Sequence, residues 1–427
     1  MITHLGAFES TQMFGTDEDV LSTTRHLKLW REDLTLLQDA GIRELRYSVP
    51  WHRIEQTEGE FDWSWMDGPM RHMQESGMQP IVDPLHHTSF PAWLTDGFLN
   101  PEFPRLYTRF LECFAERYDW VDRYTVFNEP LPTTLFCSYT GMWYPHRASD
   151  HDFVAMVIQA GKAICSASSL LKEKNARNQI VYVDTAESHR ALDRKSVEWV
   201  RFANARRFAI HDLVLGKVDR HHAMHGYLVQ HGMSLEDIGW FKDHAATIDV
   251  LGLDYYPHSE MEWFWNAELG RADIRNPVMS PGGFAAVAME YVRKFRVPIL
   301  LSETNVRGTI FDRLSWLKLM EQECESLALN GVDFRGFCWY PSIDSTDWSN
   351  CCTRCTRAVD PQGIWWLDEH RWRRHRSELS DAYSRLAQGK ITAKDLPAYE
   401  WEWPVDQQLR GFLRFTNNWK WVEQVAA

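Results

Sequence analysis

Two glutamates, each at the end of an apolar segment, are the residues of this sequence best placed to do chemistry. Glu129 closes the stretch "YTVFNE", and Glu303 closes the stretch "PILLSE". Burying a lone carboxylate is costly unless it is paired or protonated, so each needs a reason to be there. Two carboxylates that face one gap fit glycoside hydrolysis, in which one donates a proton to the leaving oxygen and the other attacks the anomeric carbon.

Polar side chains close several other apolar segments in the same way. Arg46 lies in "ELRYSVPW", where its guanidinium could keep Glu303 ionised through a charge-assisted hydrogen bond. Asn128 alternates away from Glu129 along a strand, although at a bent strand end it could still reach a sugar hydroxyl. The polar residues at such ends are Arg46, His86, His87, Asn128, Glu129, Asp184, Glu187, Asp254, Glu303 and Asp344.

Eight such apolar segments recur along the chain, separated by helical patterns. One of these patterns places Leu27, Trp30, Leu34 and Leu37 at helical spacing, with Gly41 where a helix would end. Strands that alternate with helices predict parallel strands joined by crossovers, and eight such units predict an α/β fold, the (β/α)8 or TIM barrel. The predicted strands begin at His4, Glu44, Gln79, Arg123, Gln179, Ile248, Pro298 and Gly336.

The strand ends of such a barrel converge on one face, where active sites lie. We therefore expect Glu129, on the fourth strand, to lie nearly opposite Glu303, on the seventh. The catalytic barrel is predicted to span residues 1–390. Residues 391–427 are rich in tryptophan and are predicted to form an extension packed on the barrel, with a lid or a wall of the sugar site as the alternative.

The composition argues against several classes of partner. The chain has 46 Lys and Arg against 59 Asp and Glu, a net charge of −13, which does not suit nucleic acid or an anionic membrane. No stretch approaches about 18 uninterrupted apolar residues, so no membrane span is expected. Its 21 tryptophans suit either a large core or a carbohydrate partner, because a flat indole stacks on a sugar ring. The oligomeric state stays open.

The eight cysteines are too dilute for a disulfide scaffold. Cys352 and Cys355 form a C-x-x-C pair, but a zinc site normally needs a second pair, so no metal is expected. The N-terminus lacks a basic segment followed by an apolar one. Free thiols in the cytoplasm are therefore the expectation.

Six segments, in order along the chain, resemble motifs of glycoside hydrolase family 1, which lies within the clan of (β/α)8 retaining glycosidases. They are "LRYSVPWHRI", "DPLHHTSFPAWL", "YTVFNEP", "IDVLGLDYYP", "LLSETN" and "WYPSIDSTDW". The resemblance implies a retaining β-glycosidase that needs no cofactor, with Glu129 as acid/base and Glu303 as nucleophile. The substrate-binding residues it implies are Arg46, His87, Asn128, Asp254, Tyr256, Trp339, Asp347 and Trp348, with Tyr256 bonding the nucleophile and the two tryptophans serving as sugar platforms.

Several positions depart from the family pattern. Asp254 replaces an asparagine, and Asp347 replaces the glutamate that reads the outer sugar hydroxyls. The glutamine of the first strand is ambiguous, since Glu9 and Gln12 both lie near its place. These departures concern the reading of the sugar, so we expect an unusual glycone and poor activity on simple β-glucosides.

Three other functions compete with hydrolysis. A transglycosylase would share the same covalent intermediate, and a catalytically inactive barrel would bind a saccharide without cleaving it. A metal-dependent hydrolase would need clustered histidines, but His86 and His87 are adjacent and face opposite sides of a strand.

Overall fold

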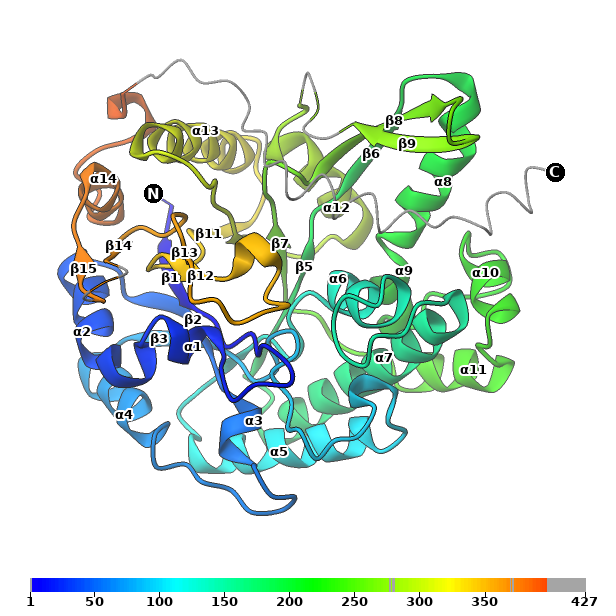
Figure 1. Ribbon diagram of the computed structural model, residues 1–427, viewed down its shortest axis with the longest axis horizontal. Helices are drawn as coiled ribbons and strands as arrows, with labels where there is room; N and C mark the ends of the chain where they lie inside the picture. Colours follow the sequence, from blue (N-terminus) through cyan, green and yellow to red (C-terminus); the bar gives the residue numbers. More distant parts are fainter. Residues whose placement is uncertain (1, 276–277, 279–280, 369, 371, 398–427) are drawn as a thin grey trace.

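A closed barrel of eight parallel strands forms the centre of the protein, in the order β1-β11-β10-β7-β5-β4-β3-β2 (Figure 1). The computed structural model describes residues 2–275, 278, 281–368, 370 and 372–397. The TIM-barrel prediction is confirmed, and each predicted segment supplies one strand. The barrel strands are β1 (His4–Phe8), β2 (Glu44–Ser48), β3 (Gln79–Asp83), β4 (Arg123–Tyr124), β5 (Gln179–Thr185), β7 (Val250–Asp254), β10 (Ile299–Glu303) and β11 (Phe334–Cys338).

The fourth strand is shorter than its sequence suggests, because regular pairing ends at Tyr124. The residues that follow continue in contact with both neighbouring strands. The backbone N–H of Thr125 donates to Val82 beside it, and the N–H of Glu129 donates to Val183 on the other side. The segment that carries Asn128 and Glu129 is therefore still fixed between β3 and β5.

Helices surround the barrel (Figure 1). Gly41 and Gly77 follow α2 and α4 with φ of 82° and 68°, a left-handed conformation that glycine adopts without strain. The helices are α1 (Val20–Thr23), α2 (His26–Asp39), α3 (Trp51–Ile54), α4 (Asp67–Ser76), α5 (Phe103–Arg117), α6 (Pro130–Thr134), α7 (Asp150–Lys174), α8 (Val197–Arg206), α9 (Ala209–Val214), α10 (His225–Gln230), α11 (Leu235–Asp243), α12 (Phe284–Phe295), α13 (Ile310–Leu329) and α14 (Glu378–Ala387).

Helix α7 is the one helix of the described chain that is long and apolar enough to cross a membrane. Two thirds of its apolar window is buried inside the protein, as in a core helix. Phe153, Val157 and Ile164 are among its buried side chains. The apolar surface of α7 is thus used in packing.

Two large apolar clusters divide the interior of the described chain, beside a small third one of Met13, Val20 and Cys352. The larger one lies between the barrel and its helices and includes Leu37, Tyr47 and Phe110. A smaller one fills the barrel and includes Ala7 and Val183. A residue next to each of these two along its strand belongs to the larger cluster. Because successive side chains of a strand face opposite sides, membership of a cluster shows which way each barrel residue points.

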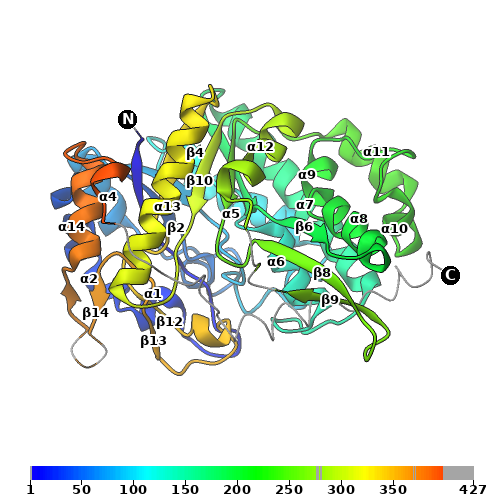
Figure 2. The ribbon, with the colours of Figure 1, turned by 90° about the horizontal axis from the view of Figure 1, so that it is seen from above.

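Additional strands extend the loops at the carboxyl ends of the barrel strands. Strand β6 (Ser188–Ala191) pairs with β8 (Glu260–Asn266), which pairs with β9 (Arg271–Arg275), and this sheet lies beside α8 (Figure 2). Two short hairpins pair β12 (Ser345–Thr346) with β13 (Val359–Asp360) and β14 (Trp366–Leu367) with β15 (Arg374–His375).

The predicted C-terminal extension is described only at its start. The Lys318 ammonium of α13 donates to the Leu396 carbonyl at 2.6 Å, which attaches this part to the barrel. Residues 398–427, with Trp401, Trp403, Trp419 and Trp421, lie outside the described residues, so the domain boundary stays a prediction.

Candidate active site

A bulge at the end of β10 turns Glu303 toward the barrel mouth. Leu301 pairs with Leu253 of β7, and after a register shift Glu303 pairs with Asp254. Ser302 is the extra residue, and its hydroxyl donates to Asp254 Oδ1 at 2.5 Å. In a regular strand, Ser302 and Glu303 would face opposite sides, whereas the extra residue of a bulge re-aims the side chain beyond it.

Two donors hold the Glu303 carboxylate. Arg46 Nη1, from β2, donates to Oε1 at 2.5 Å, and the Tyr256 hydroxyl donates to Oε2 at 2.7 Å. These are the two contacts expected from the sequence. Burial by itself would lower the pKa of Arg46, but the charges around it, first of all Glu303, raise that pKa well above its usual value. Arg46 therefore stays cationic and places a positive charge against the Glu303 carboxyl group.

Glu129 reaches the same mouth through an unusual backbone conformation. It precedes α6 with φ of 44°, a left-handed value that is uncommon for a side chain other than glycine. Pro130, at the first helical position, suits the abrupt helix start. His87 also has a left-handed φ, of 49°, and its Nε2 lies 3.6 Å from Glu129 Oε2, while its Nδ1 is 2.9 Å from the Thr133 hydroxyl.

Three carboxyl groups meet at this point. One oxygen each of Glu129, Asp254 and Glu303 lies within 4.8 Å of the other two, and all three side chains are buried. Burial, followed by the charges of Glu303 and Asp184, raises the pKa of Glu129 well above its usual range. Oxygens this close could hold a metal ion by spacing alone, but Arg46 already supplies a cation to the group.

Asn128 adds a free donor next to these carboxyls. Its Oδ1 accepts from Arg46 Nη2 at 2.6 Å, which fixes the amide orientation. Its Nδ2 is fully buried and donates to no group among the described residues. A buried donor without a partner costs free energy that a ligand acceptor would recover. Through Arg46, Asn128 is linked to the carboxylate of Glu303, and its reach to a sugar hydroxyl stays a prediction.

A second layer of polar residues lies beside this cluster. His86 Nδ1 is 2.6 Å from Asp83 Oδ2, and its Nε2 is 3.3 Å from Glu9 Oε2. Burial by itself would lower the pKa of His86, but these two carboxylates raise it to about 10. His86 and His87 have different hydrogen-bond partners, but their rings lie 4.5 Å apart. The expectation that they face opposite sides of a strand is wrong, because β3 ends at Asp83 and the alternation of a strand does not extend to them.

Glu9 is the functional candidate that the sequence left ambiguous. Its Oε1 accepts from the Trp348 indole at 2.6 Å, and the Trp348 ring lies 5.6 Å from the His87 ring. Gln12, in contrast, is fixed to the backbone, with its amide donating to Thr88 and Phe90. Glu9 and Trp348 therefore lie on the site side, and Gln12 is a structural residue.

The prediction of Trp339 as a sugar platform is wrong. Trp339 belongs to the outer core, is fully buried, and donates its indole N–H to the Gln362 carbonyl at 2.8 Å. The next residue, Tyr340, belongs to the cluster inside the barrel. Its ring stacks on His86 at 5.8 Å and lies 5.0 Å from the Arg46 guanidinium. A one-residue offset along a strand changes the face, so Tyr340 lines the site.

The prediction that Asp347 reads sugar hydroxyls is also wrong. Asp347 is fully buried, and both carboxylate oxygens are taken by the loop that follows it. Oδ1 accepts from Asn350 Nδ2 and from the backbone N–H and hydroxyl of Thr356, and Oδ2 accepts from the Arg357 N–H. The Asp347 carboxylate therefore fixes the loop that follows it. It gives no support to our expectation of poor activity on β-glucosides.

Asp347→Ala is expected to destabilise the protein, because four donors in the loop lose a charged acceptor. We expect the free energy of unfolding to fall by roughly 2–4 kcal/mol, measured by denaturant unfolding. Asn350→Ala removes one of these donors and is the milder control. A change in sugar preference with unchanged stability in Asp347→Ala would restore the sugar-reading role.

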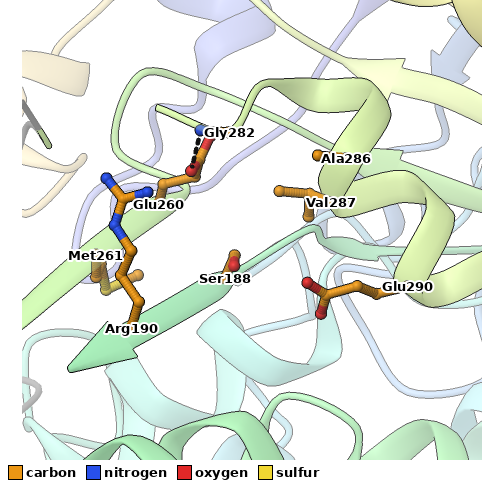
Figure 3. A pocket seen from close by; sticks show the side chains of 8 residues that line it. All are labelled: Ser188, Arg190, Glu260, Met261, Gly282, Ala286, Val287 and Glu290. Atoms are coloured by element: carbon orange, nitrogen blue, oxygen red, sulfur yellow. Dashed lines mark hydrogen bonds between the residues drawn. The ribbon is translucent and has the colours of Figure 1, made fainter. Parts of the chain in front are cut away.

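A separate cavity of about 140 Å³ lies between the added sheet and α12 (Figure 3). Glu260 crosses its edge and accepts from the Gly282 N–H at 2.7 Å. No residue predicted for the active site lines this cavity. Its lining is Ser188, Arg190, Glu260, Met261, Gly282, Ala286, Val287 and Glu290.

Solved structures share this fold. The β-glucosidase of Thermotoga maritima in complex with deoxynojirimycin superposes with a TM-score of 0.77 over 91% of this chain and 97% of that one, at 15% identity. The same enzyme with glucoimidazole gives the same values. The fold and the site together define a class of protein, the (β/α)8 barrels that hold two glutamates close together at the mouth.

The sequence profile of glycosyl hydrolase family 1 matches residues 9–270, and the chain belongs to this family. Beta-glucosidase 12 of Oryza sativa subsp. indica is 32% identical over 147 residues, which cover 31% of this chain and 27% of that protein. The probable inactive beta-glucosidase 14 of Oryza sativa subsp. japonica is 29% identical over 135 residues, 29% of this chain and 26% of that protein. The matches thus span about a quarter of each of these relatives.

Proposed function

We propose that this chain is a retaining β-glycosidase that acts by double displacement, with Glu303 as nucleophile and Glu129 as acid/base. The observation that carries the proposal is the spacing of the two carboxyl groups: an oxygen of Glu129 lies within 4.8 Å of an oxygen of Glu303. Retaining enzymes hold this pair about 5–5.5 Å apart, whereas inverting enzymes need roughly 6.5–9.5 Å to admit a water.

The surroundings of each glutamate suit its proposed role. Arg46 and Tyr256 each donate to one oxygen of Glu303 and fix its orientation, as a nucleophile requires. Burial and neighbouring negative charge raise the pKa of Glu129, which favours the protonated form that the acid of the first step requires. In the second step Glu129 takes a proton from water, or from a sugar hydroxyl in transglycosylation, and Glu303 is released.

The substrate in this proposal is a β-linked glycoside or oligosaccharide. Asn128 and Glu9 offer a donor and an acceptor for sugar hydroxyls, and Trp348 offers an aromatic face beside His87. The names of the relatives favour β-glucosides as the first substrates to try. The described cysteines are all free thiols, which supports a reducing, cytoplasmic setting.

The test is a panel of aryl β-glycosides with NMR detection of the first anomer released. We expect at least one glycoside to be cleaved and the β-anomer to appear first. Release of the α-anomer would contradict the retaining mechanism. Binding of monosaccharides without turnover of any glycoside would favour the alternative, a catalytically inactive saccharide-binding barrel.

A further inference from the structure

The carboxyl groups at the barrel mouth outnumber the cations that face them. Glu129, Asp254 and Glu303 are all buried, and Arg46 is the cation hydrogen-bonded to the group in the described chain. Burial, then the charges of His86 and Arg46, lower the pKa of His87 well below its usual value, so this neighbour of Glu129 is neutral. If all three carboxyls were ionised, the site would hold two uncompensated buried charges, which is a costly arrangement.

Asp254 has an oxygen suited to a shared proton. It stands at the end of β7, opposite Glu303 across the bulge, and its Oδ1 accepts from Ser302. Its Oδ2 is fully buried and has no hydrogen-bond partner among the described residues. A bare buried acceptor next to another carboxyl is stabilised when one proton lies between the two groups.

We propose that Glu129 and Asp254 share one proton in the free site, so that Asp254 is a positioning residue that keeps the acid/base supplied with its proton. This inference rests on the proposed function and adds a residue to it. The direction of the pKa shift of Asp254 supports the shared proton. Burial, then the charges of Glu303 and Glu129, raise this pKa well above its usual range. Since the interaction between two sites is reciprocal, an ionised Asp254 opposes the ionisation of Glu129 equally.

Proton and charge balance through both steps. In the first step the shared proton moves to the glycosidic oxygen, the bond from that oxygen to the anomeric carbon breaks, and a Glu303 oxygen bonds to the carbon. Glu303 loses its charge as an ester while the Glu129–Asp254 pair becomes doubly negative, so the net charge is unchanged. In the second step water gives its proton to the pair and its oxygen to the carbon, and Glu303 leaves as a carboxylate.

The charged and titratable groups around the pair come from several elements. Arg46 and Asp83 belong to β2 and β3, and Glu303 belongs to β10. The others are His86, His87, Asp184, Tyr256 and Tyr340. Asp184 also raises the pKa of Glu129, so its variants cannot serve as neutral controls.

Asp254→Asn tests the proposal because the amide keeps the shape of the side chain but cannot hold the proton. With a poor leaving group, the basic limb of kcat/KM against pH is expected to move to lower pH by about one unit or more. The reason is that Glu129 then ionises without a second carboxylate beside it. Ser302→Ala changes no charge and removes a hydroxyl that lowers the pKa of Asp254, so it should not move the limb to lower pH. An unmoved limb in Asp254→Asn overturns the proposal.

A second readout does not depend on turnover. Carbon-13 NMR of the labelled carboxyl carbons should show Glu129 and Asp254 titrating together in the wild type, and Asp254 titrating at lower pH in Glu129→Gln. Independent titration of the two signals, each at the pH found in the single variants, would overturn the shared proton while leaving the glycosidase intact. Joint titration in a protein that cleaves no glycoside would uphold the pair and reject the proposed function.

Discussion

Replacing Glu303 by glycine is expected to abolish turnover of aryl β-glycosides. In enzymes that use a covalent nucleophile, loss of that residue lowers kcat by roughly 10⁴-fold or more. Glu303 is fixed by Arg46 and Tyr256, so the truncation leaves a small space facing the anomeric carbon and lined by two donors. Azide can enter such a space and attack where the carboxylate attacked, which should restore cleavage and yield the α-glycosyl azide.

The configuration of the azide product makes this a sharp experiment. In Glu129→Ala the nucleophile is intact, so azide should intercept the covalent intermediate from the other face and yield the β-glycosyl azide. The pair of variants therefore assigns both roles by product structure. If Glu303→Gly gave the β-product, or kept wild-type activity without azide, the assignment of the nucleophile would be wrong.

Glu129→Ala is expected to discriminate between leaving groups. A poor leaving group needs the proton of Glu129, and losing a general acid costs about 10²–10⁴-fold in rate. A dinitrophenolate leaves without protonation, so its departure should be almost unchanged, and the covalent intermediate should accumulate because no base activates water. A rapid burst of dinitrophenol followed by slow turnover is the expected measurement.

His87→Ala serves as the comparison for this experiment. His87 Nε2 lies 3.6 Å from Glu129 Oε2, so His87 is a neighbour of the proposed acid. Its loss should lower the rates for good and poor leaving groups by similar factors. Equal losses for both classes in Glu129→Ala would show that Glu129 does not protonate the leaving group.

The barrel could be predicted because its signals are local. Each strand is a short apolar run, and glycines such as Gly41 and Gly77 end helices where a left-handed residue is needed. The ends of these runs also identified Glu129 and Glu303, since a charged side chain directly after a buried strand is costly unless a partner or a ligand meets it. Arg46 lies in the middle of β2, where its charge is equally costly without a partner. Order along the chain then sufficed to place these residues at one mouth.

The direction of individual side chains could not be predicted in the same way. Trp339 and Tyr340 are neighbours in sequence directly after β11, and only the path of the chain there decides which of them faces the inside of the barrel. Asp347 matched a sugar-reading position by alignment, but the donors that take up its carboxylate lie up to ten residues further along, in a loop without a periodic pattern. Short-range spacing does not specify such contacts.

The amino-acid sequence by itself placed two carboxylates, an arginine and a tyrosine on or just after strands of one barrel, because the periodicity of strands and helices is a local property of the sequence. The tertiary structure decided that Glu303 faces the mouth through a bulge and that Glu129 does so through a left-handed backbone. It also brought Asp254 within 4.8 Å of both glutamates. Mutual distance, and with it the sharing of charge and protons, depends on how strands from distant parts of the chain align, which no local pattern encodes.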